Sequence, residues 1–207
     1  IIDKVNRKWL LVTLDVFRLI VVSIFLYFIS KFNFEISFLY PVAFFMGLGN
    51  SLFWPTAQAF VQELVSEKDY FNANKLLSAS YQVGSIFGAG VGGLVVHAYS
   101  PIVALWINIL TYIVSAIFIS LAPFKRKNIY TEGKSLFDLI MKGFSYLKIR
   151  IDILVLGLTT ILSDVAIWGS LSVLTITISK EVFGKGSLGY GIMDGLYGIG
   201  ALFSKVL

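Results

Sequence analysis

The sequence predicts an all-α bundle of membrane-spanning helices, and its composition and its long apolar segments are the observations that predict it. Of its 207 residues, 57% are hydrophobic and 14% are charged, whereas a soluble domain has about 45–50% and about 25%. The mean hydropathy is +0.83. A hydrocarbon core about 30 Å thick needs about 20 apolar helical residues, and several runs reach that length. The runs lack the alternation of strands, and an open sheet cannot face lipid.

Six segments have the length and composition of a spanning helix. The fourth begins with Ser100-Pro101, which reads as an N-cap followed by a proline at the first helical position. Asn72 or Asn74 is the expected N-cap of the third, and the sixth is interrupted by five glycines. The expected spans are residues 9–30, 37–61, 75–98, 101–122, 152–178 and 188–207.

The connections divide the chain and predict its orientation. Residues 1–122 are expected to form one group of helices and residues 152–207 the start of a second, joined by a linker over 123–151. With residues 1–8 and 123–151 in the cytoplasm, twelve of the 17 Lys and Arg lie on the cytoplasmic side and three outside, as the positive-inside rule requires. Apolar residues at helical spacing in the linker predict an amphipathic helix at the membrane surface or, alternatively, a helix for a partner protein. They are Leu136, Ile140, Phe144, Leu147 and Ile151.

The residue inventory excludes several kinds of site. The chain has no Cys and one His, which excludes disulfides, thiolate metal sites and multi-His zinc sites. Neither a nucleotide-binding Gly-x-x-x-x-Gly-Lys-Ser/Thr loop nor a Gly-x-Ser-x-Gly nucleophile motif is present. The basic residues lie in short gaps between apolar runs, so they form no face for nucleic acid. We therefore expect a membrane protein that is not an enzyme and has no catalytic residues, metal or cofactor.

Three charged residues within the spans are candidates for transport or coupling, because charge at bilayer depth is costly. Asp15 and Arg18 are three residues apart on one helix and can pair. That pair is either structural or part of proton or substrate coupling. Asp164 has no cation near it in the sequence, so it is either a protonatable group facing a cavity or the partner of another helix. Asp194 is expected to be solvated or to cap its helix.

Five uncharged side chains are candidates for lining a substrate cavity. Trp54 and Trp168 offer aromatic surface, as a pocket for a large amphipathic compound requires. The carboxamides of Gln58, Gln82 and Asn108 can bind a solute or, equally, bond a neighbouring helix.

A charged motif precedes the first span and resembles a signature of the major facilitator superfamily. Read alone, its cations are a positive-inside anchor, while an acid before them can cap a helix start or pair with a neighbouring helix. Asn6 stands where the superfamily's cytoplasmic loop between helices two and three usually has glycine. The residues at matching positions are Asp3, Lys4, Arg7 and Lys8.

A glycine motif in the third span resembles the Gly-x-x-x-Gly-Pro-x-x-Gly-Gly of antiporters in the same superfamily, with Ala89 in place of proline. Its members are Gly84, Gly88, Gly92 and Gly93. Glycines four residues apart line one helix face, which implies close approach of another backbone, and ordinary membrane-helix packing would give the same pattern. The segment from Phe53 to Ala59 is similar to the macrolide-efflux and enterobactin-exporter branch.

The resemblance implies an incomplete carrier, covering about helices three to eight of twelve, with residues 123–151 as the central loop. It further implies secondary transport in the cell membrane: proton-coupled efflux of a hydrophobic or amphipathic compound, drug-like or siderophore-like. The expected partners are the lipid bilayer, the small-molecule substrate, protons and the remaining helices of the full-length protein. A non-transporting or lipid-moving protein of the same fold is the alternative. An intramembrane aspartyl protease is disfavoured, because Asp164 and Asp194 follow Ser163 and Met193 rather than that family's motifs.

Overall fold

The computed structural model describes residues 6–32, 35–123, 141 and 145–204, and all regular structure in them is helical. The predicted all-α class is thereby confirmed. The elements are α1 (Arg7–Lys31), η1 (Ile36–Phe38), α2 (Leu39–Leu64), η2 (Glu67–Asp69), α3 (Tyr70–Ala98), α4 (Pro101–Leu121), α6 (Ile151–Asp164), η3 (Val165–Gly169), α7 (Ser170–Thr177), η4 (Ile178–Val182) and α8 (Gly186–Ser204).

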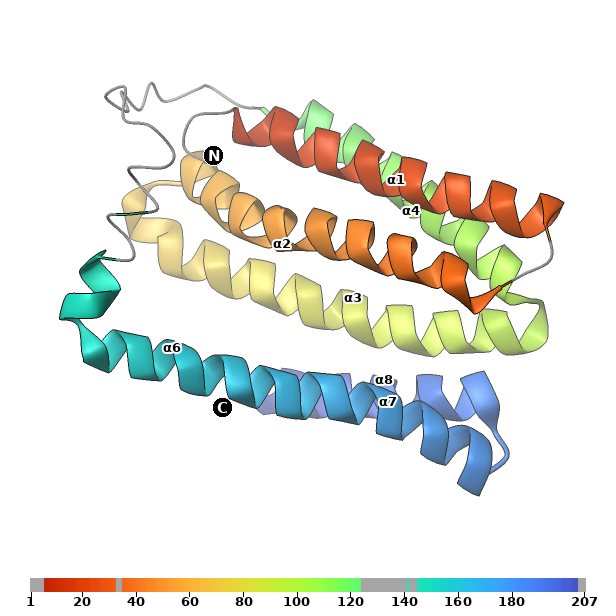
Figure 1. The fold of residues 1–207 in the computed structure, drawn as a ribbon. Helices are drawn as coiled ribbons and strands as arrows, with labels where there is room; N and C mark the ends of the chain where they lie inside the picture. Colours follow the sequence, from red (N-terminus) through yellow and green to blue (C-terminus); the bar gives the residue numbers. More distant parts are fainter. Residues whose placement is uncertain (1–5, 33–34, 124–140, 142–144, 205–207) are drawn as a thin grey trace.

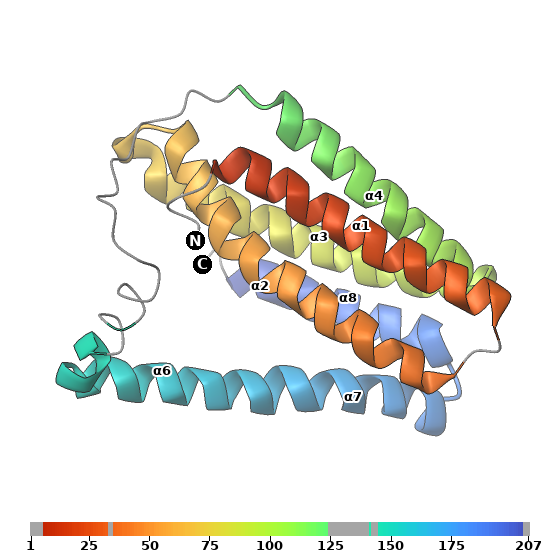
Figure 2. The same cartoon turned by 45° about the horizontal axis from the view of Figure 1, so that its top comes forward.

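The four N-terminal helices run antiparallel to one another in chain order (Figure 1). α1 packs between α2 and α4, and α3 packs against α2, α4 and most extensively against α8. α6, η3, α7 and η4 continue one another as a single long rod, and Figure 2 shows this rod set apart from α1 and α4. η3 and η4 are π-helical turns within it.

Five helical segments are long and apolar enough to cross a membrane: Arg7–Lys31, Ile36–Leu64, Glu67–Ala98, Pro101–Leu121 and Ile151–Val182. They match the first five predicted spans. The sixth predicted span coincides with α8, which is helical but is not among the five. Its glycines and Asp194 lower its hydropathy, and its last three predicted residues, 205–207, lie outside the described residues.

Two predicted helix starts had different outcomes. The Ser100 side chain accepts a bond from the Val103 amide at 3.3 Å, with Pro101 next in the chain, so the predicted cap is confirmed. The predicted cap at Asn72 or Asn74 is wrong, because α3 begins at Tyr70 and both asparagines lie inside it. The preceding turn η2 leads into α3 without a break, so no asparagine cap is needed.

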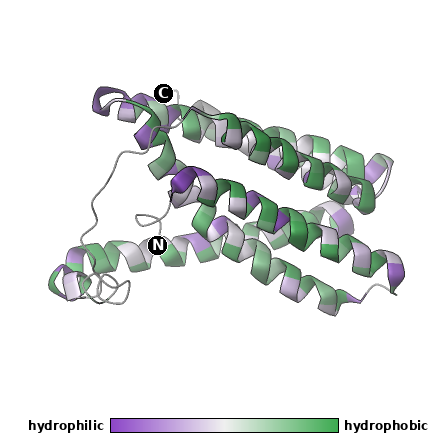
Figure 3. Ribbon diagram, turned by 90° about the horizontal axis from the view of Figure 1, so that it is seen from above, coloured by the Kyte–Doolittle hydropathy of each residue, from purple (hydrophilic) through white to green (hydrophobic). Residues whose placement is uncertain are grey.

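The core is small and lies around α1. Leu11 packs with Ala57 and Phe60 of α2, and a second cluster joins α1 to Ile109 of α4. Many other large apolar side chains are exposed, on helices that are largely hydrophobic in Figure 3. Lipid tails are as apolar as leucine, so in a bilayer this surface carries no hydrophobic penalty.

The predicted amphipathic helix of the linker falls mostly on residues that the structure does not describe, including Leu136, Ile140 and Phe144. Residues 145–149 are helical. Arg150 follows them, and its guanidinium pairs with Asp152 at 2.7 Å at the start of α6.

Candidate functional site

A polar cavity of about 460 Å³ lies between α2 and α3. α2 contributes one aromatic ring and two carboxamides, and α3 contributes a carboxamide, two hydroxyls and one apolar side chain. Its lining consists of Trp54, Gln58, Gln62, Asn74, Leu77, Ser78 and Tyr81. The structure thus brings together two of the five predicted cavity residues, Trp54 and Gln58.

Helical periodicity places these side chains on facing surfaces. Trp54, Gln58 and Gln62 are spaced four residues apart along α2, which puts them on one face. Asn74 and Ser78 repeat the spacing on α3, and Tyr81 follows one turn later. The same signal is present in the sequence. The predicted spans 37–61 and 75–98 exclude Gln62 and Asn74, so the full pattern emerges only with the longer helices of the structure.

An aromatic pair forms one wall of the cavity. The rings of Trp54 and Tyr81 meet edge to face, with centroids 4.7 Å apart and planes at 89°. Such T-shaped contacts favour a fixed ring orientation. Pro55 lies inside α2 directly after Trp54, and a proline there removes one backbone hydrogen bond of the helix. The cavity therefore combines a fixed aromatic surface with a locally weakened helix.

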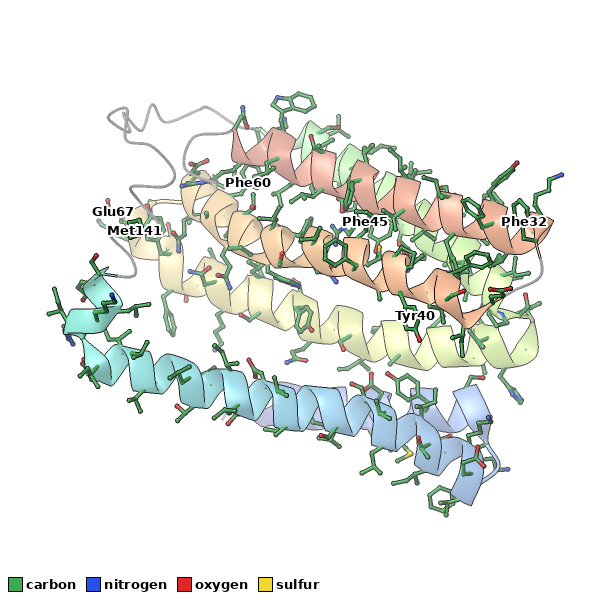
Figure 4. The ribbon with its side chains drawn as sticks, in the orientation of Figure 1. Phe32, Tyr40, Phe45, Phe60, Glu67 and Met141 are labelled. Atoms are coloured by element: carbon green, nitrogen blue, oxygen red, sulfur yellow. The ribbon has the colours of Figure 1, made fainter. Side chains whose placement is uncertain are left out.

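The cavity lies toward one end of the bundle. Figure 4 places Phe60, Glu67 and Met141 at this end, and Phe32 and Tyr40 at the opposite end. The lining of α2 comes from its second half and that of α3 from its first half. α2 ends at Leu64 and α3 begins at Tyr70 on this side of the bundle, which is the side predicted to be cytoplasmic.

The other three predicted cavity residues lie elsewhere. Gln82 is half-buried on α3 next to Tyr81 but does not line the cavity. Asn108 lies in α4, and its buried Oδ1 accepts no hydrogen bond from any described residue. Trp168 belongs to the π-helical turn η3, and its side chain lies outside the described part of the chain.

Asp15 and Arg18 form the predicted ion pair within α1, and they are only 1% and 6% exposed. The second carboxylate oxygen of Asp15 accepts a hydrogen bond from Ser115 Oγ of α4 at 2.6 Å. Arg18 Nη1 donates to Asn50 Oδ1 of α2 at 3.0 Å. The pair thus joins three helices through fully engaged charges, as a buried pair requires.

Aromatic rings and a glycine complete the enclosure of Arg18. Its guanidinium carbon lies 4.2 Å from the ring centre of Phe53 and 4.9 Å from that of Tyr112, within the range of cation–π attraction. A Cβ on Gly49 would lie 2.9 Å from Arg18 Cγ, so glycine allows α2 this close. Sequence reasoning found the pair but none of these partners, because they come from other helices.

Two cations of the basic motif link the start of α1 to the C-terminal ends of α2 and α4. Arg7 pairs with Glu63 near the end of α2, and Lys8 Nζ donates to the Ala122 carbonyl just past α4 at 2.8 Å. Cations at helix C-termini also complement the helix dipole. Asp3 and Lys4, the other two members of the motif, lie outside the described residues.

The carboxylates of Asp164 and Asp194, in the C-terminal helices, differ in their surroundings. Asp164, at the end of α6, is exposed. Asp194 lies two turns inside α8, so it does not cap that helix, and it is half-buried. It lines a cavity of about 200 Å³ together with Ser172 and Thr175 of α7 and Tyr197 of α8. No group of three metal-ligating side chains occurs among the residues that the structure describes.

The glycine motif makes a close approach to another described helix at one of its four positions. A Cβ on Gly84, Gly88 or Gly92 would meet nothing within 4 Å. The close approach is made instead by Gly93, where a Cβ would lie 2.7 Å from the Ser187 carbonyl of α8. On α8, a Cβ on Gly191 would lie 2.7 Å from the Ala89 carbonyl of α3, and a Cβ on Gly198 would lie 2.5 Å from Ile86 Cγ1. Of the motif, only Gly93 therefore contacts another described helix at backbone distance.

A second cavity is wholly apolar and lies between α1 and α2, toward the end opposite the polar one. Its volume is about 450 Å³. Five phenylalanines dominate the lining, which consists of Phe17, Ile20, Val21, Ile24, Phe25, Phe28, Phe38, Pro41, Val42 and Phe45. This groove, rather than the Trp54 cavity, has the chemistry that was expected for an amphipathic drug.

Comparison with known proteins identifies the family. Residues 1–207 match the transmembrane secretion effector family of the major facilitator superfamily. The chain belongs to this family. It is also 26% identical, over its whole length, to proteins named "Putative bacilysin exporter BacE" from Bacillus subtilis and Bacillus amyloliquefaciens. The chain spans 51% of the length of these relatives, and no solved structure matches it significantly.

Family membership confirms the resemblance based on the two motifs. It places the chain among multi-pass membrane proteins of this family, and it sets aside the aspartyl protease hypothesis. The described helices form an all-α bundle of this family.

Proposed function

We propose that the full-length protein is a secondary active exporter of a small molecule and that the α2–α3 cavity is part of its substrate path. The observation that carries the proposal is a polar cavity bounded by two spanning helices in a secretion effector chain. Polar groups at membrane depth are costly and mark substrate pathways. Relatives named as exporters support the direction of transport.

The proposed topology places the cavity near the cytoplasmic side of the cell membrane, where an exporter collects its cargo. Residues 1–122 would contribute four helices to the first six-helix half, 123–151 the central loop, and 152–207 the start of the second half. In carriers built from such repeats, the two halves rock about a site near the bilayer midplane. The contact between α3 and α8 joins the two proposed halves.

Proton coupling is part of the proposal, with Asp164 as the coupling carboxylate. A carboxylate in a membrane span is costly when charged, so uptake and release of a proton can accompany the opening of each side. The Asp15–Arg18 pair is assigned a structural role, because the two charges pair with each other and also bond Asn50 of α2 and Ser115 of α4.

The test measures accumulation of ethidium, erythromycin and bacilysin in cells that lack their own efflux pumps, with and without the full-length protein. Export lowers accumulation of at least one compound, and a protonophore restores it. Asp164→Asn is expected to abolish the protonophore effect. Asp152→Asn is the matched control, since Asp152 lies on the same helix and pairs with Arg150 at its exposed start. Equal accumulation of all three compounds with and without the protein contradicts export, and full coupling in Asp164→Asn contradicts the role of that residue.

A lipid-moving protein is the second candidate, and the apolar groove between α1 and α2 is the observation that favours it. Its phenylalanines form a surface suited to an acyl chain. Fluorescent phospholipid in proteoliposomes distinguishes the candidates. Movement of lipid between leaflets that stops in Phe25→Ser, without any export of the three compounds, would favour this function over efflux.

A further inference from the structure

The α2–α3 cavity has a definite chemical character, on which a substrate class can be based. Three carboxamides, from Gln58, Gln62 and Asn74, each offer a donor and an acceptor. The hydroxyls of Ser78 and Tyr81 add two further groups of both kinds. None of the seven lining residues carries a formal charge.

From this lining we infer that the cavity selects a neutral solute rich in amide or hydroxyl groups, with one flat apolar face. The inference rests on the proposed export function and specifies its cargo. A neutral solute exchanges its hydrogen bonds with water for bonds to the carboxamides at little cost. A permanent cation or anion would give up part of its hydration without meeting an opposite charge in the lining, which is unfavourable.

The aromatic wall accounts for the flat apolar face. Trp54 is half-buried, and its ring is held edge to face by Tyr81 at 4.7 Å and by Phe53 at 6.2 Å. A ring held from two sides loses little conformational freedom when a ligand stacks on it. Leu77 of α3 is the one aliphatic side chain in the lining. The solute is therefore expected to place a ring or a planar group against Trp54.

The contrast with the apolar groove sharpens the assignment. That groove is lined by ten residues without a single polar side chain, whereas five of the seven residues of the α2–α3 cavity have side chains that both donate and accept hydrogen bonds. A hydrophobic drug would lose more than it gains among unpaired carboxamides. Binding of such a compound in the groove, independently of Gln58 and Gln62, is therefore an outcome that the test must recognise.

The experiment measures binding of three probes to the full-length protein in nanodiscs by calorimetry: N-acetylphenylalaninamide, tetraphenylphosphonium and benzenesulfonate. The neutral amide is expected to bind at least tenfold more tightly than either ion. Gln58→Leu and Gln62→Leu should each weaken its binding about 2- to 12-fold, the value of one hydrogen bond. Gln82→Leu is the matched control and should change nothing, since Gln82 is a carboxamide on α3 outside the cavity.

A charge-introducing variant provides the decisive comparison. Gln58→Glu gives the cavity a negative charge. It should therefore weaken binding of the neutral amide and raise the affinity for tetraphenylphosphonium by tenfold or more. Trp54→Phe should weaken binding of the amide probe. It should also abolish the change in tryptophan fluorescence that binding of the probe next to Trp54 is expected to cause. Equal affinity of the unaltered protein for the cation and the amide, with no effect of Gln58→Leu, would overturn the substrate class.

The same probes separate this inference from the proposed function. Binding of the amide that depends on Gln58, without any export activity in cells, supports the cavity chemistry and contradicts the exporter. Export of ethidium that is unaffected by Gln58→Leu and Gln62→Leu supports the exporter and overturns the substrate class.

Discussion

Removing one member of the Asp15–Arg18 pair should destabilise the protein far more than removing both. Asp15→Leu leaves the Arg18 guanidinium buried at 6% exposure without its carboxylate. Breaking a buried pair from one side costs about 3–5 kcal/mol, whereas replacing both partners by apolar residues of similar volume is close to neutral. The double variant Asp15→Leu, Arg18→Met should therefore have a free energy of unfolding within about 1 kcal/mol of that of the unaltered protein.

The measurement is reversible unfolding of the full-length protein in mixed micelles of dodecyl sulfate and a mild detergent. A double-mutant cycle gives the coupling energy of the pair directly. Ser115→Ala should lower the free energy of unfolding by about 1.5–3 kcal/mol, because it removes a hydrogen bond to a charged group. Ser120→Ala on the same helix is the control, since the Ser120 hydroxyl donates to the Ile117 carbonyl of its own helix and not to a charged group among the described residues. Single variants that cost less than 1 kcal/mol, or an additive double variant, would refute the reasoning.

Three further predictions concern helix contacts. Arg7→Gln should lower the free energy of unfolding by about 1.5–3 kcal/mol, because it removes a charge-assisted hydrogen bond to Glu63. An unchanged free energy of unfolding in the same micelles would mean that this ion pair does not stabilise the protein. Gly191→Ala should lower the melting temperature because its Cβ would lie 2.7 Å from the Ala89 carbonyl, while Gly92→Ala, with nothing within 4 Å, should leave it unchanged. Asn108→Leu should keep or raise stability, because it removes a buried acceptor without a described partner, and a loss above 1 kcal/mol would show that another helix bonds it.

Sequence periodicity was enough for the helices and for part of the site. Apolar runs predicted the five spans, and the i, i+3 spacing predicted the Asp15–Arg18 pair. Trp54 and Gln58 were predicted because tryptophan and carboxamide side chains are scarce within the apolar runs.

Periodicity within one helix does not show which other helix packs against a given face of it. Ser115 is separated from Asp15 by 100 residues, and nothing local links them. The glycine stripe was assigned a packing role from its spacing, yet contact follows the helix face that a neighbour occupies, which is the Gly93 face. Asn74 was taken for a cap because asparagine favours helix starts, whereas the 3₁₀ turn η2 had already begun the helical backbone.

The partners of the buried pair are met at different times as the chain is made. Arg18 can find Asp15 within a single turn of helix, so α1 carries a neutralised pair from the moment it forms. Asn50 lies 32 residues further along and Ser115 lies 100 residues beyond Asp15. At about 5–20 residues per second, the carboxylate waits roughly 5–20 s of synthesis for its last hydrogen bond. The close spacing of the pair thus bridges the interval during which α1 occupies the bilayer before α4 exists.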